Sequence, residues 1–281
     1  EISACLVGSE MCIRDRIKMS VKRVKLVVAY DGTNYCGWQV QPNGITIEGV
    51  LNRELSKLLK EDIVVIGASR TDSGVHSYGN VAVFDTNARM PAEKISYALN
   101  QRLPEDIVVQ NSCEVPPDWH PRHCNSRKTY EYRILNREFP MPQRRLDTWF
   151  VYRKLNIPAM CEAARRFEGT HDFKSFCSVN TAVEDTTRTI YSCELEQQGD
   201  LLTIRVTGSG FLYNMVRIIA GTLFDVGIGK IAPEDIPAIL ERKDRKAAGP
   251  TAPAHGLTMI GLEYEIRPET LMRPGGKLTE K

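Results

Sequence analysis

Apolar residues along this chain fall into short runs separated by longer stretches with helical spacing, which predicts alternating strands and helices. In the first part, apolar positions form one face of a helix over 47–60, with Thr46 as its cap. A second helix is predicted over 91–99, beginning at a proline. The predicted strands are 24–30, 63–66, 80–85 and 107–113. The expected order is therefore β-α-β-β-α-β.

The second part of the chain repeats this order. Residues 128–135 alternate tyrosine and isoleucine with polar residues, as a strand with one buried face does. Helices are predicted over 156–167 and 212–226, and strands over 187–196, 201–208 and 257–266. Two such units predict an α+β fold of two ferredoxin-like halves with antiparallel sheets. The same topology occurs in RNA-binding modules whose sheets present aromatic side chains to bases.

A polar loop between two predicted strands concentrates reactive side chains. Residues 67–76 read GASRTDSGVH, with Arg70 two residues before Asp72. A hairpin turn with a solvated charge pair explains the glycines and serines, but it explains this arginine–aspartate spacing less well. Loops held by core strands often carry catalytic groups because the scaffold fixes them. We therefore expect a functional loop with both charged side chains on one side.

The segment 70–76, RTDSGVH, resembles the signature of the TruA family of tRNA pseudouridine synthases, and further matching segments follow in the family's order. They are YDGT at 30–33, GWQ at 37–39, KTYEY at 128–132, GTHDF at 169–173, GFLYNMVR at 210–217 and APAHGL at 252–257. The resemblance extends from about residue 23 to residue 264. Ser73 and Pro121 stand where the family more often has alanine, and neither difference removes a functional group.

This resemblance implies a tRNA pseudouridine synthase, an isomerase (intramolecular transferase) acting on the anticodon stem-loop at positions 38, 39 and 40. It implies two halves related by pseudo-symmetry around a central RNA-binding cleft, and a homodimer in which both subunits contact one tRNA. It implies no cofactor and no metal. By the same resemblance, Asp72 supplies the ionised carboxylate, and whether this group attacks the base, attacks the sugar or abstracts a proton stays open.

Three further residues are predicted to assist Asp72. A paired uridine must leave the stack before it reacts, and Arg70 could fill the vacated position. A buried carboxylate needs an opposite charge, and Arg217 is the candidate because it lies on an otherwise apolar predicted helix. An arginine on an apolar helix more often lies at the solvated edge of that helix. The family match instead favours a role for Arg217 in the active site. By that match, Tyr130 stacks on the uracil or takes the proton from carbon 5.

The best candidate for an RNA-binding segment is 119–128, WHPRHCNSRK, in which five potentially basic residues accompany a tryptophan. This composition suits phosphate contact combined with stacking, and a solvated linker is the alternative. Because the net charge is only +2, RNA binding requires a local patch of this kind. The predicted RNA-binding residues are Arg122, His123, Arg127 and Lys128.

Composition indicates in which cellular compartment this protein works. No apolar run approaches the roughly 20 residues of a membrane span. Eight scattered cysteines without a CxxC pair indicate reduced thiols in a cytoplasmic protein, and the histidines lack metal-ligand spacing. We expect an extension over 1–18 outside the family match, halves over 19–125 and 126–270, and a polar tail over 271–281.

Two other functions remain as alternatives. One is a non-catalytic RNA-binding protein on the same scaffold, which would not need Asp72. The other is a phosphatase that uses Asp31 in the turn after the first strand, and this would require magnesium. The phosphatase motif has a second aspartate two residues away, whereas Ala29 and Thr33 occupy those positions here.

Overall fold

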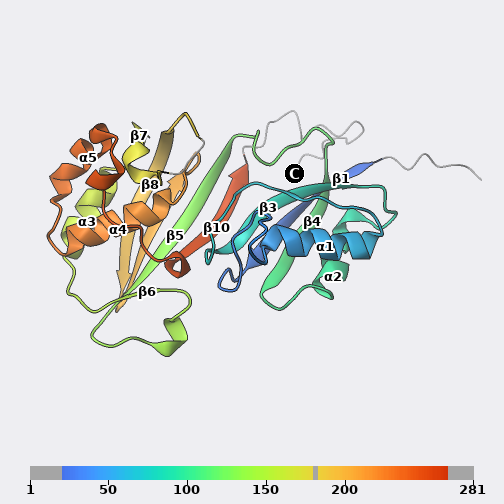
Figure 1. The fold of residues 1–281 in the computed structure, drawn as a ribbon, viewed down its shortest axis with the longest axis horizontal. Coiled ribbons are helices and arrows are strands. Elements are labelled where there is room, and N and C mark those ends of the chain that lie inside the picture. The colour runs from blue at the N-terminus through green and yellow to red at the C-terminus, as the bar shows by residue number, and fades with distance from the viewer. Residues whose placement is uncertain (1–20, 180–182, 265–281) are drawn as a thin grey trace, which may run out of the picture.

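The computed structural model describes residues 21–179 and 183–264. One long sheet runs through the molecule, and the helices gather in two groups, one at each end (Figure 1). The predicted extension over 1–18 and the tail over 271–281 lie outside the described residues.

The first half has the predicted element order. Its elements are β1 (Lys22–Tyr30), α1 (Ile47–Leu59), β2 (Ile66–Gly67), β3 (His76–Thr86), α2 (Ala92–Asn100) and β4 (Ile107–Val115). Helix α1 begins where expected, because the Thr46 side chain accepts a hydrogen bond from the Gly49 amide. The strands lie in the order β4-β1-β3-β2 and are antiparallel. Of the strand predicted over 63–66, only the end pairs with β3.

The second half repeats the same strand order as β10-β5-β9-β8, again antiparallel. Its elements are β5 (Ser126–Asn136), β6 (Trp149–Val151), α3 (Ile157–Arg165), β7 (Gly169–Asp172), β8 (Thr187–Gln198), β9 (Leu201–Gly208), α4 (Met215–Gly227), α5 (Ile236–Arg242) and β10 (Leu257–Tyr264). The short elements β6, β7 and α5 were not predicted. Helix α4 begins later than predicted because Asn214, just before it, has a left-handed backbone with φ of 60°.

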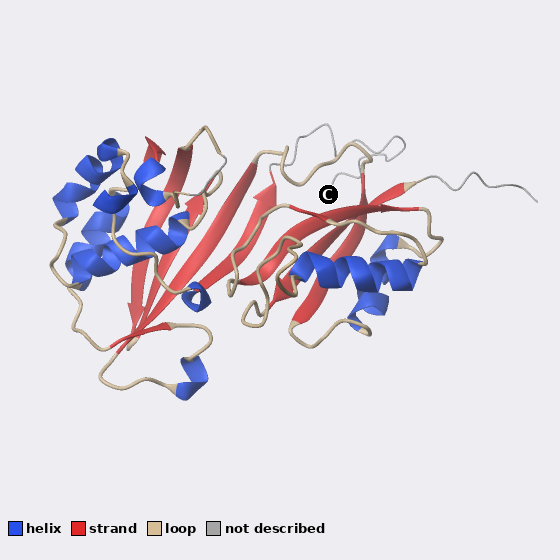
Figure 2. Ribbon diagram, in the orientation of Figure 1, coloured by secondary structure: helices blue, strands red, loops and turns tan. Residues whose placement is uncertain are grey.

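The two halves share one sheet, and the prediction of antiparallel sheets holds only for the four main strands of each half, since the short β6 pairs with β5 in parallel. Strands β3 and β10 are parallel, with His76 opposite Thr258 and Ser77 opposite Met259. Strand β2 covers β3 only near Val83, which leaves the beginning of β3 as a free edge for β10. Within the described residues, the result is a continuous mixed sheet of ten strands (Figure 2).

Each half has its own hydrophobic core. One cluster packs α1 and α2 against β1, β3 and β4. The other packs α3, α4 and α5 against β5, β8 and β9. Val75, from the first half, belongs to the second cluster. The polar loop that precedes β3 is therefore anchored in both halves.

Strand β5 departs in one respect from its predicted alternation. Tyr130, Tyr132 and Ile134 are buried as expected, but Glu131 on the polar face is buried as well. Its carboxylate accepts hydrogen bonds from Arg205 at 2.6 Å and from Arg133 at 3.0 Å. Burial of this carboxylate is possible because both arginines compensate its charge.

Candidate active site

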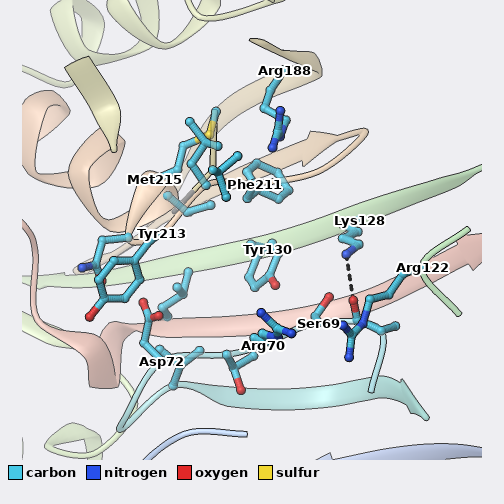
Figure 3. A pocket seen from close by; sticks show the side chains of 18 residues that line it. Ser69, Arg70, Asp72, Arg122, Lys128, Tyr130, Arg188, Phe211, Tyr213 and Met215 are labelled. Atoms are coloured by element: carbon cyan, nitrogen blue, oxygen red, sulfur yellow. Dashed lines mark hydrogen bonds between the residues drawn. The ribbon is translucent and has the colours of Figure 1, made fainter. Parts of the chain in front are cut away.

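A cavity of about 490 Å³ lies where the two halves meet. Its walls come from the loop over 67–76, which we call the signature loop, from β5, and from the segment 211–216 that leads into α4. Asp72, Arg70 and Tyr130 line it together (Figure 3). The fold thus brings into one space three residues that the sequence predicted to act together.

The signature loop is held by the last residue of β1 and by the segment that follows it. The Tyr30 hydroxyl hydrogen-bonds to the Thr71 hydroxyl at 2.7 Å, and the Trp38 amide donates to the Thr71 carbonyl at 3.1 Å. The Ser73 hydroxyl donates to the Tyr35 carbonyl at 3.1 Å. The segments YDGT and GWQ therefore have a structural role, because they fix the loop that carries Asp72.

Two glycines allow this close approach. Gly37 has φ of +83°, and a Cβ at this position would lie 2.6 Å from the Thr71 carbonyl oxygen. A Cβ on Gly32 would lie 2.0 Å from the Val75 carbonyl oxygen. A side chain at either position would push the signature loop away.

Asp72 and Arg217 form an ion pair between the halves. An Asp72 carboxylate oxygen lies 3.5 Å from an Nη atom of Arg217, and their side chains are 18% and 17% exposed. Burial raises the pKa of Asp72, and the Arg217 charge opposes that rise. The pairing expected for a buried carboxylate is present. An ionised carboxylate with a raised pKa is also a stronger base than a solvated one.

Arg217 is itself fixed by other contacts. Its Nε donates to the Ala252 carbonyl at 2.7 Å, and its Nη1 donates to the Asn214 side-chain oxygen at 2.7 Å. Nη1 is also the nitrogen that lies 3.5 Å from the Asp72 carboxylate, so Asn214 and Asp72 share it. The APAHGL segment supplies the carbonyl that orients this arginine, and the Pro253 carbonyl accepts from the Tyr132 hydroxyl at 2.8 Å.

Tyr130 is 8% exposed and packs edge-on against Phe211, with ring centroids 5.1 Å apart. Burial raises the pKa of Tyr130 to about 12. The phenol is therefore protonated at neutral pH and cannot accept a proton there. Of the two roles considered for Tyr130, stacking suits this environment better.

Arg70 is exposed at the mouth of the cavity, between Asp72 and Arg122 (Figure 3). Both Arg70 and Asp72 line the same cavity, which is the arrangement that their spacing predicts. The exposed position leaves the arginine side chain able to move.

The predicted RNA-binding residues separate into two pairs. Arg122 and Lys128 line the cavity, and they donate to the carbonyls of Gly67 and Ala68 at 2.8 and 3.2 Å. His123 instead stacks on His120, with centroids 3.9 Å apart. Arg127 lies over the Tyr191 ring at 4.9 Å. Of the four predicted RNA-binding residues, Arg122 and Lys128 line the cavity together with Asp72, and His123 and Arg127 do not.

The cavity also contains residues that were not singled out from the sequence, chiefly Arg188, Phe211 and Tyr213. The two aromatic residues belong to the matched segment at 210–217, which offered a signal for them. Arg188 had none, because a single arginine at the start of a strand follows no recognisable pattern.

Asp31 lies away from this cavity. Its carboxylate pairs with His76 Nδ1 at 3.0 Å, and it lines a separate cavity with Asp106 and Asp147. His76 Nε2 also hydrogen-bonds to the His255 carbonyl at 3.2 Å. Within residues 21–179 and 183–264, no three His, Cys, Asp or Glu side chains cluster as a metal site would require.

Five of the described cysteines are free thiols: Cys36, Cys113, Cys124, Cys161 and Cys193. Among the helices of the described part of the chain, none is both long enough and apolar enough to cross a membrane.

Comparison with known proteins agrees with the site. A family model described as tRNA pseudouridine synthase matches residues 26–123 and 163–265. The chain belongs to the TruA family of tRNA pseudouridine synthases. This membership removes the phosphatase alternative.

Individual relatives match over nearly their whole length. Proteins named tRNA pseudouridine synthase A from Thermoanaerobacter sp. and Acetivibrio thermocellus are each 47% identical over 244 residues, covering 87% of this chain and 100% of the relative. The Bacillus subtilis protein of that name is 45% identical over 245 residues, with 86% and 99% covered. The solved structure of a Cbf5-Nop10-Gar1 complex covers 72% of this chain and 45% of its own chain. Its 18% identity and TM-score of 0.31 are too low to identify a shared fold.

Proposed function

We propose that this protein converts uridine to pseudouridine in the anticodon stem-loop of tRNA, at positions 38, 39 and 40. The observation that carries the proposal is the Asp72 carboxylate, paired with Arg217 at 3.5 Å inside a cavity of about 490 Å³. Such a cavity is large enough to accommodate a nucleoside. Family membership supplies the reaction and the substrate.

The reaction is an isomerisation. The bond between N1 of uracil and C1′ of the ribose breaks, a bond between carbon 5 and C1′ forms, and the proton on carbon 5 leaves to solvent while N1 gains one. No electrons are transferred and no group is donated, so a carboxylate in the cavity supplies the chemistry required. Asp72 is the nucleophile or base in this proposal, and Arg217 keeps it ionised and oriented.

The other cavity residues prepare the substrate. A uridine in a stem has to leave its base stack, which costs a few kcal/mol. Arg70, exposed at the cavity mouth, is placed to occupy the space that the base leaves. Tyr130 offers a ring face on which the uracil can stack. Arg122, His123, Arg127 and Lys128 contact phosphates around the cavity.

We also propose that the two β-α-β-β-α-β halves, 19–125 and 126–270, are two ferredoxin-like units, and that the groove between them receives the RNA. The shared strand order of the halves supports this description. On the basis of the family resemblance, the protein works in the cytoplasm as a homodimer, without cofactor or metal. Sedimentation analysis with and without tRNA tests the dimer.

Release of tritium from tRNA carrying [5-³H]uridine tests the activity. The wild-type protein should release tritium equally well with and without a chelator, and primer extension on the carbodiimide-treated product should locate pseudouridine at positions 38 to 40. Asp72→Asn should release tritium far more slowly than wild type while still binding tRNA. A protein that binds tRNA without releasing tritium would instead be the non-catalytic RNA-binding alternative.

A further inference from the structure

Three cationic side chains from separate segments line the cavity, away from Asp72. Arg122 lies between β4 and β5, Lys128 on β5 and Arg188 on β8, and all three line the cavity (Figure 3). Burial and the charges of Arg122 and Arg188 lower the pKa of Lys128 to about 8. Burial and the neighbouring positive charges both disfavour the ammonium form of Lys128. An anion bound beside Lys128 would stabilise that form.

A second cavity, of about 440 Å³, adjoins the first. Arg122 and Lys128 line both, so these two side chains form a wall shared by the two spaces. Tyr191, which is 45% exposed, and Ser209 line the second cavity. An exposed aromatic ring beside a cationic wall suits a nucleotide base and its phosphate.

The shared wall is connected to the signature loop. Arg122 and Lys128 donate to the carbonyls of Gly67 and Ala68, the residues that lead into the Arg70–Asp72 segment. A phosphate bound by these cations would therefore have a fixed position relative to Asp72. Because the cations come from both halves, the phosphate would also link the halves.

We propose that Arg122, Lys128 and Arg188 form a binding site for one phosphodiester of the substrate, the one joining the target uridine in the first cavity to a neighbouring nucleotide in the second. This inference rests on the proposed function and adds to it a specific phosphate contact. It differs from general attraction of RNA, because it predicts that a single backbone charge dominates the contribution of these three residues.

The test is a double-mutant cycle between protein and RNA. The neutral RNAs are anticodon stem-loops with one methylphosphonate, either 5′ or 3′ of the target uridine. The charged RNAs have the ordinary phosphodiester at that linkage, and the adjacent 2′-hydroxyl is methylated in both. Affinities are measured for Asp72→Asn protein, so that no turnover occurs, with and without Lys128→Met. Lys94→Met, on α2 and outside both cavities, is the matched control.

Lys128→Met should weaken binding of the charged RNA about tenfold, as expected for loss of a charge-assisted hydrogen bond. When the methylphosphonate stands at one of the two linkages, the neutral RNA should bind equally well to Asp72→Asn protein with and without Lys128→Met. Lys94→Met should leave affinity unchanged. Equal losses for charged and neutral RNA at both linkages would overturn the proposal, because Lys128 would then act only through general charge or through its contact with Ala68.

Arg188→Gln provides a second route if Lys128→Met does not fold. Its guanidinium donates to the carbonyls of Asp185 and Thr187 and not to the signature loop, so its loss should disturb that loop less. Arg188→Gln should weaken binding of the charged RNA but not of the RNA that is neutral at that same linkage. If neutralising neither linkage removes the effect of Arg188→Gln, the proposed site is wrong. Tritium release by otherwise wild-type protein, measured separately, distinguishes failure of this inference from failure of the proposed activity.

Discussion

The Asp72 carboxylate lies 3.5 Å from the guanidinium of Arg217, although the two residues belong to different halves of the molecule. Asp72 comes from the loop before β3, and Arg217 lies in the first turn of α4. The parallel pairing of β3 with β10 places these two segments side by side. Each half therefore supplies one member of the pair, and neither half alone contains the site.

Asp72→Asn should reduce the rate of pseudouridine formation by at least about 10² to 10⁴-fold, because asparagine cannot act as nucleophile or base. tRNA affinity should stay within a few-fold of wild type, since the side chain keeps its size. Single-turnover assays with saturating protein and a parallel binding titration check both statements. A rate near that of wild type would eliminate Asp72 as the catalytic group.

The same variant has a stability signature. Because burial raises the pKa of Asp72, the ionised carboxylate lowers the stability of the folded protein above that pKa. Asp72→Asn should therefore melt at a higher temperature than wild type at neutral pH. The difference should vanish as pH falls below the ordinary aspartate value of about 3.9, where the group is protonated in both states. Melting curves across pH measure this, and a less stable asparagine variant at neutral pH would contradict it.

Arg217→Lys should lower the catalytic rate roughly 10²-fold, although the charge is conserved. Lysine cannot donate to Ala252, Asn214 and Asp72 in one plane, so the carboxylate loses its orientation. The comparison is Arg205→Lys, whose arginine contacts Glu131 outside the cavity and whose rate should change little. Similar rates for both variants would show that Arg217 does not orient Asp72.

Arg70→Ala should impair reaction on a native stem more than on a stem whose target uridine is mismatched. If Arg70 occupies the space left by the flipped base, it offsets an unstacking cost that the mismatched RNA has partly met already. Single-turnover rates of variant and wild type on both RNAs make the comparison internal. Equal losses on the two RNAs would mean that Arg70 acts on Asp72 or on a phosphate instead.

Gly37→Ala should destabilise the protein by more than the roughly 1 kcal/mol expected for alanine at positive φ, because its Cβ would also press on the Thr71 carbonyl. Gly199→Ala is the control, since Gly199 has φ of +60° and open space around it. Urea unfolding gives both values. Activity should fall only for Gly37→Ala, and equal effects of the two variants would show that the close approach is unimportant.

The local elements could be predicted from sequence where a single segment determines its own structure. Helix α1 follows from its apolar spacing and the Thr46 cap, and the order of elements in each half follows from alternating periodicities. The short strands β6 and β7 and the helix α5 carry too few residues for a periodic signal. Helix α4 begins later in the chain than predicted because of the left-handed φ of Asn214. That conformation depends on tertiary contacts, including the hydrogen bond that the Asn214 side chain donates to the Ser178 hydroxyl.

Within the site, sequence indicated the chemistry, and the tertiary structure decided the contacts. The spacing of Arg70 and Asp72 and the apolar surroundings of Arg217 could be read from the chain alone. That Arg217 pairs with Asp72, and that Arg122 joins Lys128 at a wall shared by two cavities, depends on how β3 meets β10. Periodicity and motifs report interactions between residues near in sequence. Contacts between the halves depend on backbone pairing across the sheet, which no local pattern encodes.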